Sequence, residues 1–341
     1  MEFELPSLEE LRENAFVVRL PLRVMFRGVV QREALLLQGP AGWGEFSPFL
    51  EYGPAESSRW LAAGIESAYQ PYPQTTVTQI PVNATLPAVT PEQVARVLGQ
   101  YDEPHTIKIK VAEAGQILQD DIARVAETRR LYPDAKLRVD ANAGWTLDQA
   151  VPALSRLSEY DLEYAEQPVP EIADLARLRE RLAARGVQLK IAADESVRKH
   201  TDPVEVARVG AADLIVIKAQ PLGGIAAALD VVQQAGLDAV VSSALDTSIG
   251  LGQATALAAS LPELKYACGL STGTLYKDDI SEEPLIAQAG YLKVGRPSVS
   301  RAKIRHYSVE PDAYDWWMRR LAASYAHLQE QSQTDSSFTC S

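Results

Sequence analysis

Three acidic residues stand at the carboxyl ends of three successive apolar runs in this 341-residue sequence. Asp140 ends KLRVD, Glu166 ends LEYAE and Asp194 ends LKIAAD. If these runs are neighbouring parallel strands, the three carboxylates meet at one rim of the sheet. Like charges in a partly dry site repel one another, and a divalent cation compensates them. Oxygen ligands suit Mg²⁺, with Mn²⁺ as the alternative.

Each carboxylate taken alone could instead cap the helix that follows its strand, because aspartate and serine favour helix N-termini. Three such residues in successive strands favour a shared metal site over three separate caps. None of the histidines ends one of these strands, so we expect all four to be structural or surface residues. They are His105, His200, His306 and His327.

Three lysines flank the carboxylates along the chain. Lys108 and Lys110 lie two residues apart in TIKIKV, so both project to one side of a strand, and Lys218 ends DLIVIK. A solvated face of an antiparallel strand is the alternative for the first pair, and a lysine reaching out of the core is the alternative for Lys218. A parallel sheet covered by helices has no solvated face. This favours an arc around the rim of the sheet, in which Lys108 and Lys110 lie on one side of the three carboxylates and Lys218 lies on the other.

A metal flanked by ammonium groups suits the removal of a proton next to a substrate carboxylate. That proton is very weakly acidic, so the enediolate formed must be stabilised by concentrated positive charge. Lysine is a competent base when neutral, and neighbouring cations favour its neutral form. Lys108 beside Lys110 meets this requirement, so we predict α-proton abstraction.

These residues need a repeated strand-and-helix unit to position them. Eight short apolar runs recur with starts about 24 to 30 residues apart, which fits one strand, one helix and two loops. The alternation favours a closed parallel barrel with the helices outside. The expected strands lie in IPVNATLP, TIKIKV, KLRVDAN, LEYAEQP, LKIAADES, DLIVIKAQ, DAVVSSALD and LKYACGL.

The residues on either side of the barrel predict a smaller α+β unit. We expect strands in FVVRLPLRV, GVVQREALLLQG and GWGEFSP, and an amphipathic helix in PAESSRWLAAGIESAYQ. Beyond Gly290, YLKVG and VSRAKIRHYSVE are expected strands, and AYDWWMRRLAASYAHL is an expected helix. The expected boundaries are 1–78 with 286–328 for the small unit, 79–285 for the barrel, and 329–341 for a disordered tail.

Composition excludes several other classes of protein. Apolar residues make up 46% of the chain, which allows one large core. Lys and Arg total 33 against 45 Asp and Glu, and a net charge of −12 disfavours nucleic acid and anionic membranes as partners. The acidic start lacks a signal-peptide pattern, so we expect a cytoplasmic protein. Cys268 and Cys340 are too few for a disulfide framework or a cysteine metal site.

The order KxK, DAN, EQP, DES and a lysine on the sixth strand resembles the enolase superfamily, in its muconate-lactonizing subgroup. This resemblance implies an α/β fold, a modified (β/α)8-type TIM barrel of the (β/α)7β form with an N-terminal α+β capping domain. It also implies that Asp140, Glu166 and Asp194 bind magnesium, that Lys110 is the base on one face of the substrate, and that Lys218 stands on the other.

Within the subgroup, the chain is similar to members that dehydrate a cyclohexadiene carboxylate by syn elimination. The features that carry this similarity are Arg138 two residues before Asp140, the SSALDTSIG segment and the compact length. The resemblance implies a small-molecule carboxylate substrate, whose α proton Lys110 takes and returns to the departing hydroxyl.

Supporting roles follow from the same resemblance. Lys108 would tune Lys110, while Arg138 and Asn142 would support the metal rim. Ser242 and Ser243 could hold a second substrate carboxylate or form an ordinary turn. Loops of the small unit around Arg27 and Glu45 are placed where they would close over the site.

Other activities use the same residues, so the motif fixes the chemistry more firmly than the substrate. An N-succinylamino acid racemase is the first alternative, because Lys110 and Lys218 could act on opposite faces; a muconate cycloisomerase is another. A dipeptide epimerase is disfavoured because CGLSTG lacks an acidic pair, and a sugar-acid dehydratase because no His–Asp pair ends strands six and seven. A catalytically silent metal-stabilised barrel is the non-enzyme alternative. The oligomeric state is not predicted.

Overall fold

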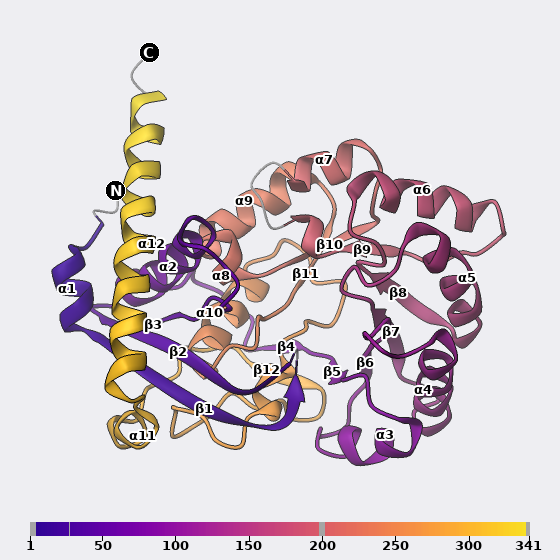
Figure 1. Ribbon diagram of the computed structural model, residues 1–341, viewed down its shortest axis with the longest axis horizontal. Coiled ribbons are helices and arrows are strands. Elements are labelled where there is room, and N and C mark those ends of the chain that lie inside the picture. Colours follow the sequence, from indigo (N-terminus) through magenta and orange to yellow (C-terminus); the bar gives the residue numbers. More distant parts are fainter. Residues whose placement is uncertain (1–4, 27, 198–201, 339–341) are drawn as a thin grey trace.

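The computed structural model describes residues 5–26, 28–197 and 202–338. Seven parallel strands form its central sheet in the order of the chain, and the sheet curls into most of a barrel (Figure 1). Each strand lies within or beside one of the apolar runs that were expected to be barrel strands, which confirms the expected alternation of strands and helices. The strands are β5 (Ala84–Leu86), β6 (Thr106–Lys110), β7 (Lys136–Asp140), β8 (Leu162–Glu166), β9 (Ile191–Ala193), β10 (Leu214–Ile217) and β11 (Asp238–Val241).

The gap between the first and last strands is closed by single bridges. The run LKYACGL was expected to be a strand, and this was wrong: Cys268 bridges Val82, and Gly269 bridges Ser242, without a regular ladder. The chains approach closely here, because a Cβ on Gly269 would lie 2.5 Å from Oγ of Ser242. Glycine at 269 therefore allows the barrel to close but weakens the strand.

Helices cover the outer side of the curved sheet (Figure 1). Their first turns carry the capping signals of the sequence; Thr146, for example, accepts a bond from the backbone N–H of Gln149. Helix α10 differs, because almost all of its side chains are buried between the barrel and the small unit. The helices of the barrel are α3 (Pro91–Leu98), α4 (Leu118–Leu131), α5 (Leu147–Leu157), α6 (Ile172–Ala183), α7 (Asp202–Arg208), α8 (Ala219–Leu222), α9 (Ile225–Ala235) and α10 (Ser248–Ala259), with 3₁₀ turns η1 (Ser158–Tyr160), η2 (Glu195–Val197) and η3 (Ser271–Leu275).

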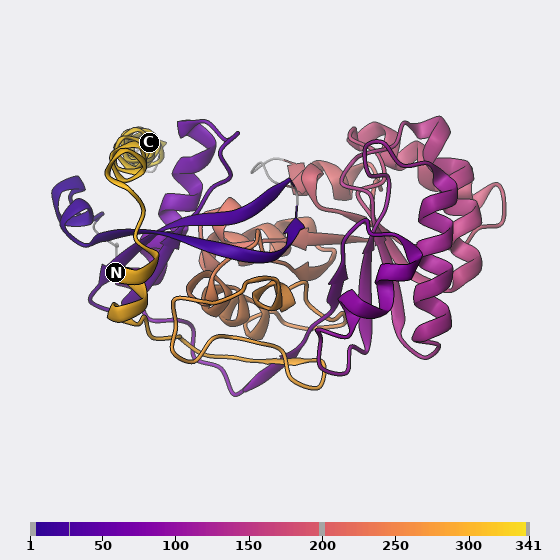
Figure 2. The ribbon, with the colours of Figure 1, turned by 60° about the horizontal axis from the view of Figure 1, so that its bottom comes forward.

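The small unit contains the three expected antiparallel strands and the expected helix. Helix α2 packs so closely on β3 that a Cβ on Gly44 would lie 1.9 Å from the carbonyl oxygen of Gly64. The β1–β2 ribbon reaches toward the barrel in both views (Figures 1 and 2). The elements are α1 (Leu8–Glu13), β1 (Ala15–Phe26), β2 (Val29–Gly39), β3 (Gly42–Phe46) and α2 (Pro54–Tyr69).

The core of the small unit also takes side chains from the barrel segment, including Leu245 and Tyr276. The core of the small unit is distinct from the core between the sheet and its helices, but both take residues from the segment after β11. The domain boundaries at 78 and 285 stay a prediction.

The C-terminal region differs from the sequence-based expectation in two places. VSRAKIRHYSVE contains helix α11 (Arg301–Tyr307), not a strand, and Ser300 caps it by accepting a bond from the N–H of Lys303. Helix α12 (Pro311–Phe338) runs through most of the tail that was expected to be disordered. No glycine or further proline interrupts the sequence of α12, so a helix that starts on the packed surface of α2 can continue.

The two remaining strands, β4 and β12, form a small sheet of their own. Strand β12 (Tyr291–Lys293) pairs antiparallel with β4 (Gln79–Pro81). Within the described part of the chain, no helix is both long and apolar enough to cross a membrane.

Candidate active site

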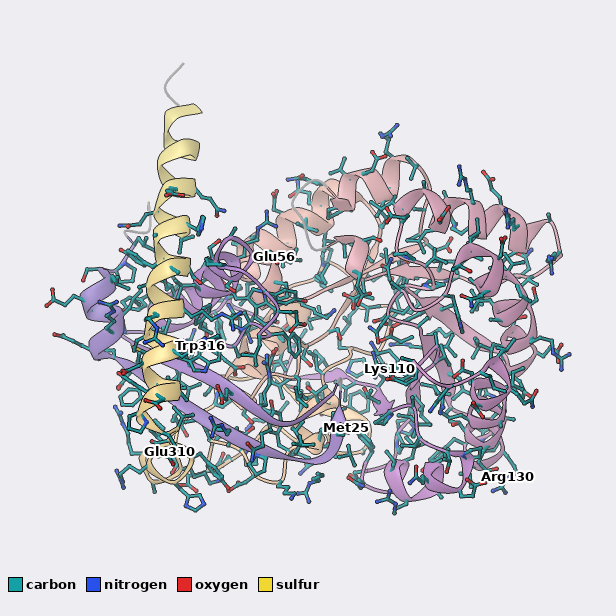
Figure 3. The ribbon with its side chains drawn as sticks, in the orientation of Figure 1. Met25, Glu56, Lys110, Arg130, Glu310 and Trp316 are labelled. Atoms are coloured by element: carbon teal, nitrogen blue, oxygen red, sulfur yellow. The ribbon has the colours of Figure 1, made fainter. Side chains whose placement is uncertain are left out.

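The lysines and carboxylates singled out in the sequence meet at the carboxyl ends of the barrel strands. Lys110, Asp140 and Glu166 are Cα partners across β6, β7 and β8, so their side chains stand at one level. Lys110 lies on the side of the barrel that faces the small unit (Figure 3). One cavity at this rim is lined by Lys108, Lys110, Asp140, Asn142, Asp194, Lys218, Ser242 and Ser243, together with Phe49, Thr85, Ala244, Leu245, Gly269 and Thr272.

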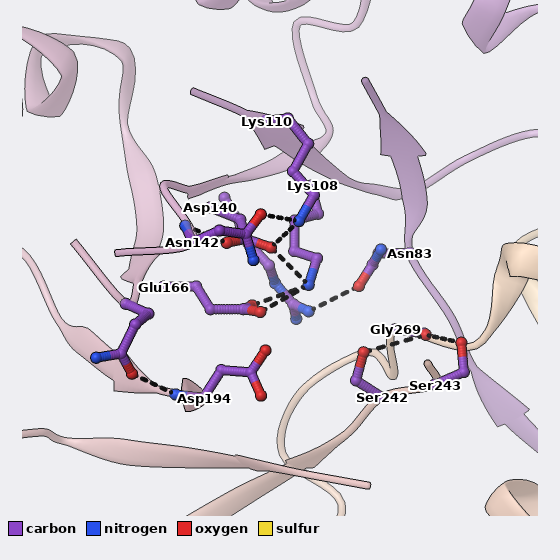
Figure 4. A network of polar contacts seen from close by, with 12 residues as sticks. Asn83, Lys108, Lys110, Asp140, Asn142, Glu166, Asp194, Ser242, Ser243 and Gly269 are labelled. Carbon is purple, nitrogen blue, oxygen red and sulfur yellow. Dashed lines mark hydrogen bonds and ion pairs between the residues drawn. The ribbon is translucent and has the colours of Figure 1, made fainter. Parts of the chain in front are cut away.

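Each lysine of the arc is paired with a carboxylate. Nζ of Lys108 lies 2.8 Å from Oε1 of Glu166, and Nζ of Lys110 lies 2.5 Å from Oδ2 of Asp140 (Figure 4). Nζ of Lys218 contacts Oδ1 of Asp194. The cluster of negative charge predicted from the strand ends is therefore balanced by three ammonium groups.

Burial and these pairs shift the pKa values of the site. Burial alone favours the neutral form of Asp140, but the charges of Lys110 and Lys108 outweigh it and hold the pKa of Asp140 far below its usual range. Burial and the nearby charge of Asp140 raise the pKa of Glu166 to about 7. Burial disfavours the charged form of Lys108, yet Glu166 and Asp140 keep the pKa of Lys108 well above its ordinary value. Lys108 is thus a fixed positive charge.

Asn142 connects the base candidate to the neighbouring carboxylate. Its Oδ1 accepts a bond from Nζ of Lys110 at 2.5 Å, and its backbone N–H donates to Oδ1 of Asp140 at 3.0 Å. The residue has a positive φ of 42°, a conformation that asparagine tolerates better than most residues. The amide also donates to Oε1 of Glu195 at 3.2 Å. Asn142 therefore holds Lys110 and Asp140 in a fixed relation.

Gln167 is a supporting residue that sequence reasoning missed. Its Oε1 accepts bonds from the backbone N–H of Asp194 at 2.9 Å and of Ser196 at 3.1 Å. Its Nε2 donates to the carbonyl of Val169 and to Oγ of Ser196. These four bonds fix the backbone at Asp194. The EQP motif contained the residue, but the partner on the next strand could not be read from it.

Arg138 lies one layer below the rim, two residues before Asp140 on β7. Nε donates to Oε2 of Glu163 at 2.6 Å, and Nη1 donates to the carbonyl of Ala267 at 2.7 Å. The guanidinium lies 4.6 Å from the ring centroid of Tyr164. A register shift between β7 and β8 at this point leaves Glu163 between the paired residues. These contacts make Arg138 part of the packed barrel interior, and its expected support of the metal rim stays a prediction.

Ser242 and Ser243 follow β11 and line the cavity. Both hydroxyl oxygens lie 3.3 Å from the carbonyl oxygen of Gly269, and Oγ of Ser243 lies 2.8 Å from Oγ1 of Thr272. Both residues also complete the barrel closure, and their expected role in binding a substrate group stays a prediction.

Of the two small-unit positions expected to close over the site, Glu45 lies near the end of strand β3 and not in a loop. Glu45 is buried and binds barrel groups: Oε2 accepts from Oγ1 of Thr247 at 2.5 Å and from the N–H of Gly250 at 3.0 Å. It therefore fastens the start of α10 to β3. Phe49, four residues later, reaches the cavity itself. Arg27 lies outside the described residues.

Among the described residues, the cavity lining does not include His105, His306, His327 or Cys268. Cys268 is buried, His306 packs edge-on against Tyr307 at 4.6 Å between ring centroids, and His327 contacts Glu330. His105 approaches Gly290. His200 and Cys340 fall outside the part of the chain that the structure describes.

The donor atoms at the rim fit a hard cation in type. Asp140, Glu166 and Asp194 offer buried carboxylate oxygens, which are the ligands that Mg²⁺ prefers. As the described side chains stand, no group of three or more His, Cys, Asp or Glu residues is arranged closely enough to hold a metal ion. The same oxygens are held by Lys108, Lys110 and Lys218, so a cation and the lysines would compete for them.

Comparisons with known proteins cover nearly the whole chain. A family model described as enolase N-terminal domain-like matches residues 17–68, and one described as enolase C-terminal domain-like matches residues 92–298. A protein from Mycolicibacterium smegmatis named o-succinylbenzoate synthase is 46% identical over 322 residues, which are 94% of this chain and 98% of that one. A protein of the same name from Mycobacterium tuberculosis is 46% identical over 325 residues, 95% of this chain and 97% of that one.

Solved structures agree on the fold. A muconate lactonizing enzyme from Pseudomonas fluorescens, complexed with muconolactone, aligns with a TM-score of 0.75 at 21% identity over 87% of this chain and 98% of that chain. A probable mandelate racemase from Alicyclobacillus acidocaldarius aligns with a TM-score of 0.67 at 23% identity over 87% of this chain and 95% of that chain.

Proposed function

The chain belongs to the enolase superfamily, and we propose that it is an o-succinylbenzoate synthase of menaquinone biosynthesis. The proposed reaction is the syn dehydration of 2-succinyl-6-hydroxy-2,4-cyclohexadiene-1-carboxylate to 2-succinylbenzoate. It removes a proton next to a carboxylate and a hydroxyl from the ring, and the two leave together as water. This is the carbon–oxygen lyase chemistry that the name of the relatives denotes.

The observation that carries the proposal is the placement of two lysines on opposite flanks of a row of carboxylates. Lys110 comes from β6 and Lys218 follows β10, while the carboxylates come from the three strands between them. Both lysines line the same cavity. A substrate bound there would therefore meet one ammonium or amine group on each side.

Lys110 is proposed as the base. It removes the α proton onto Nζ and then donates that proton to the departing hydroxyl, which requires both groups on one face of the ring, as syn elimination implies. Asn142 orients Lys110, because its Oδ1 already accepts a bond from Nζ. Lys218, on the other face, stabilises negative charge on the substrate.

Lys108 has a different part in this proposal. Its ammonium group is buried against Glu166 and Asp140 and stays charged, so it acts as a fixed cation that helps to keep Asp140 ionised. Its influence on Lys110 would be electrostatic, through the carboxylate of Asp140 that both lysines contact.

The proposed metal ligands are Asp140, Glu166 and Asp194, with Mg²⁺ as the ion and Mn²⁺ as a substitute. When bound, the ion would supply concentrated positive charge at the substrate carboxylate. Ser242 and Ser243 are proposed to receive the succinyl carboxylate, since their hydroxyl groups line the same cavity and can donate hydrogen bonds.

A direct assay tests the proposal. Purified protein with Mg²⁺ is given the cyclohexadiene carboxylate, and in parallel an N-succinylamino acid of known configuration. We expect aromatic 2-succinylbenzoate from the first substrate. Racemization without dehydration would replace the proposal by the racemase, which the opposed lysines also permit; no turnover of either substrate would favour the silent barrel.

A further inference from the structure

The segment between β3 and α2 forms part of the active-site wall. Phe49 is the one residue from the small unit among the described residues that line the cavity, and the residue is 7% exposed. The segment from Ser47 to Gly53 is neither helix nor strand, and within it the N–H of Tyr52 donates to the carbonyl of Phe49 at 3.1 Å. The shape of this wall must therefore depend on contacts from elsewhere.

Those contacts come from Arg320, on the C-terminal helix α12. Nη2 of Arg320 donates to the carbonyl oxygens of Phe49 at 2.6 Å and of Tyr52 at 2.9 Å, and to Oγ of Ser57 at 3.1 Å. Nη1 donates to the carbonyl of Pro48 at 3.2 Å. One guanidinium, distant in sequence, thus binds carbonyl groups at both ends of the turn that presents Phe49.

The guanidinium itself is held firmly. Arg320 as a residue is 8% exposed, and its guanidinium lies 5.1 Å from the ring centroid of Trp316 and 5.4 Å from that of Trp317. These residues lie on the helix labelled α12 in Figure 1, which Trp316 marks in Figure 3. Burial and the charge of Arg32 lower the pKa of Arg320 to about 10, so it remains charged near neutral pH. A planar, charged and rigid donor is suited to fixing several carbonyl groups at once.

The other side of the segment is linked to the barrel through Arg32 on β2. The guanidinium of Arg32 lies 4.3 Å from the ring centroid of Phe49 and donates to the carbonyl oxygens of Ser47 and Leu245. Leu245 also lines the cavity. Phe49 is therefore held between the guanidinium of Arg32, on β2, and the backbone that Arg320 fixes.

We propose that Arg320 is a positioning residue for the reaction: by holding the 48–52 backbone it places the ring of Phe49 against the bound substrate. This inference rests on the proposed function, since the substrate is the cyclohexadiene carboxylate. Arg320 does not contact the reacting atoms; its effect passes through Phe49. Because Phe49 packs against the substrate both before and during proton removal, loss of its position should weaken binding more than turnover.

The test compares Arg320→Met and Arg320→Lys with wild type. We expect Arg320→Met to lower kcat/KM by about tenfold to a hundredfold, mainly through KM, with kcat changed by less than about threefold. Arg320→Lys keeps the charge but not the planar fork, so its kcat/KM should fall between the two. Arg319→Met, the exposed neighbour on α12, is the matched control and should match wild type.

Two further measurements separate positioning from a general loss of structure. Hydrogen exchange of the peptide covering 48–53 should be faster in Arg320→Met, while exchange in the barrel strands is unchanged. In a Phe49→Ala background, Arg320→Met should have little further effect on kcat/KM, because the ring that it positions is absent.

An unchanged KM in Arg320→Met, or equal effects of Arg320→Met with and without Phe49, would overturn the inference. If Arg320→Met does not fold, Arg320→Lys carries the same comparison. If wild type makes no 2-succinylbenzoate, the proposed function fails, and the exchange of 48–53 still reports whether Arg320 holds the segment.

Discussion

Nζ of Lys108 lies 2.8 Å from Oε1 and 3.0 Å from Oε2 of Glu166, so one ammonium group binds both oxygens of a buried carboxylate. The side chain of Lys108 is 9% exposed and that of Glu166 is 1% exposed, so water cannot replace either partner. We predict that Lys108→Met lowers the free energy of unfolding by about 1 to 3 kcal/mol, because Glu166 loses its buried partner and must take up a proton to remain in the folded protein. Urea denaturation of the variant and of wild type measures this loss.

The matched control for that variant is Lys136→Met. Lys136 also pairs with a glutamate, Glu163, at 3.3 Å, but its side chain is 63% exposed. Exposed pairs contribute roughly 0 to 1 kcal/mol, so this variant should stay close to wild type. If Lys108→Met and Lys136→Met lost equal free energies of unfolding, the Lys108–Glu166 pair would contribute no more than an exposed pair.

Asp194→Asn should weaken magnesium binding. The change removes one charged oxygen from the proposed ligand set. Mutation of residues that only hydrogen-bond to metal ligands costs about 10- to 100-fold in metal affinity, so we expect the loss of a ligand to cost at least tenfold. Titration calorimetry with Mg²⁺ measures the change. Asp148→Asn, whose side chain is 90% exposed, serves as the control. An affinity equal to that of wild type would remove Asp194 from the ligand set.

The buried carboxylate of Asp246 should make stability depend on pH. Burial, then repulsion from Glu45, raises the pKa of Asp246 to about 8 in the folded protein, against about 4 in an unfolded chain. Between these values the folded state holds a proton that the unfolded state releases, so the contribution of Asp246 to stability is full below pH 4 and is lost as pH rises toward 8.

The variant Asp246→Asn isolates this contribution, because an amide resembles the neutral acid. Relative to wild type, the variant should gain stability from pH 5 to pH 8, by at most about 1.4 kcal/mol per pH unit. Urea midpoints at the two pH values provide the comparison. A constant difference between variant and wild type would show that Asp246 does not change its protonation on unfolding.

The strands that carry the chemistry were readable from the sequence because their signal is local. Short apolar runs recur once per strand–helix unit, and the strands β6, β7 and β8 end in the charged residues Lys110, Asp140 and Glu166. The alternation of side chains along a strand then fixes which of them share a face. The rim of lysines and carboxylates needed no further information.

Features that depend on contacts between distant segments could not be predicted. LKYACGL has the composition of a strand, but closure at Gly269 allows single bridges there. The shift that brings Glu163 to Arg138 depends on the register of β7 and β8. Helix α11 was mistaken for a strand because its seven residues are too few to display a clear helical period.

The supporting residues were missed for a similar reason. Gln167 and Phe49 are ordinary residues in their own segments, and their importance comes from Asp194 and from the cavity wall that they meet in the folded chain. The segment around Glu45 was expected to close over the site, but the contacts of Glu45 with α10 could not be predicted. The one signal in the sequence was the position of Gln167 directly after Glu166.

The central claim is that Lys110 removes the α proton of a substrate carboxylate, and exchange of that proton with solvent measures this step most directly. The substrate is incubated with Mg²⁺ and protein in D₂O, and loss of the α-proton signal is followed by NMR. Wild type should exchange or consume that proton, and so should the control Lys293→Ala, which changes an exposed residue on β12. Lys110→Ala should neither exchange nor consume the proton, although its melting curve should match that of wild type. Full exchange by folded Lys110→Ala would contradict the account.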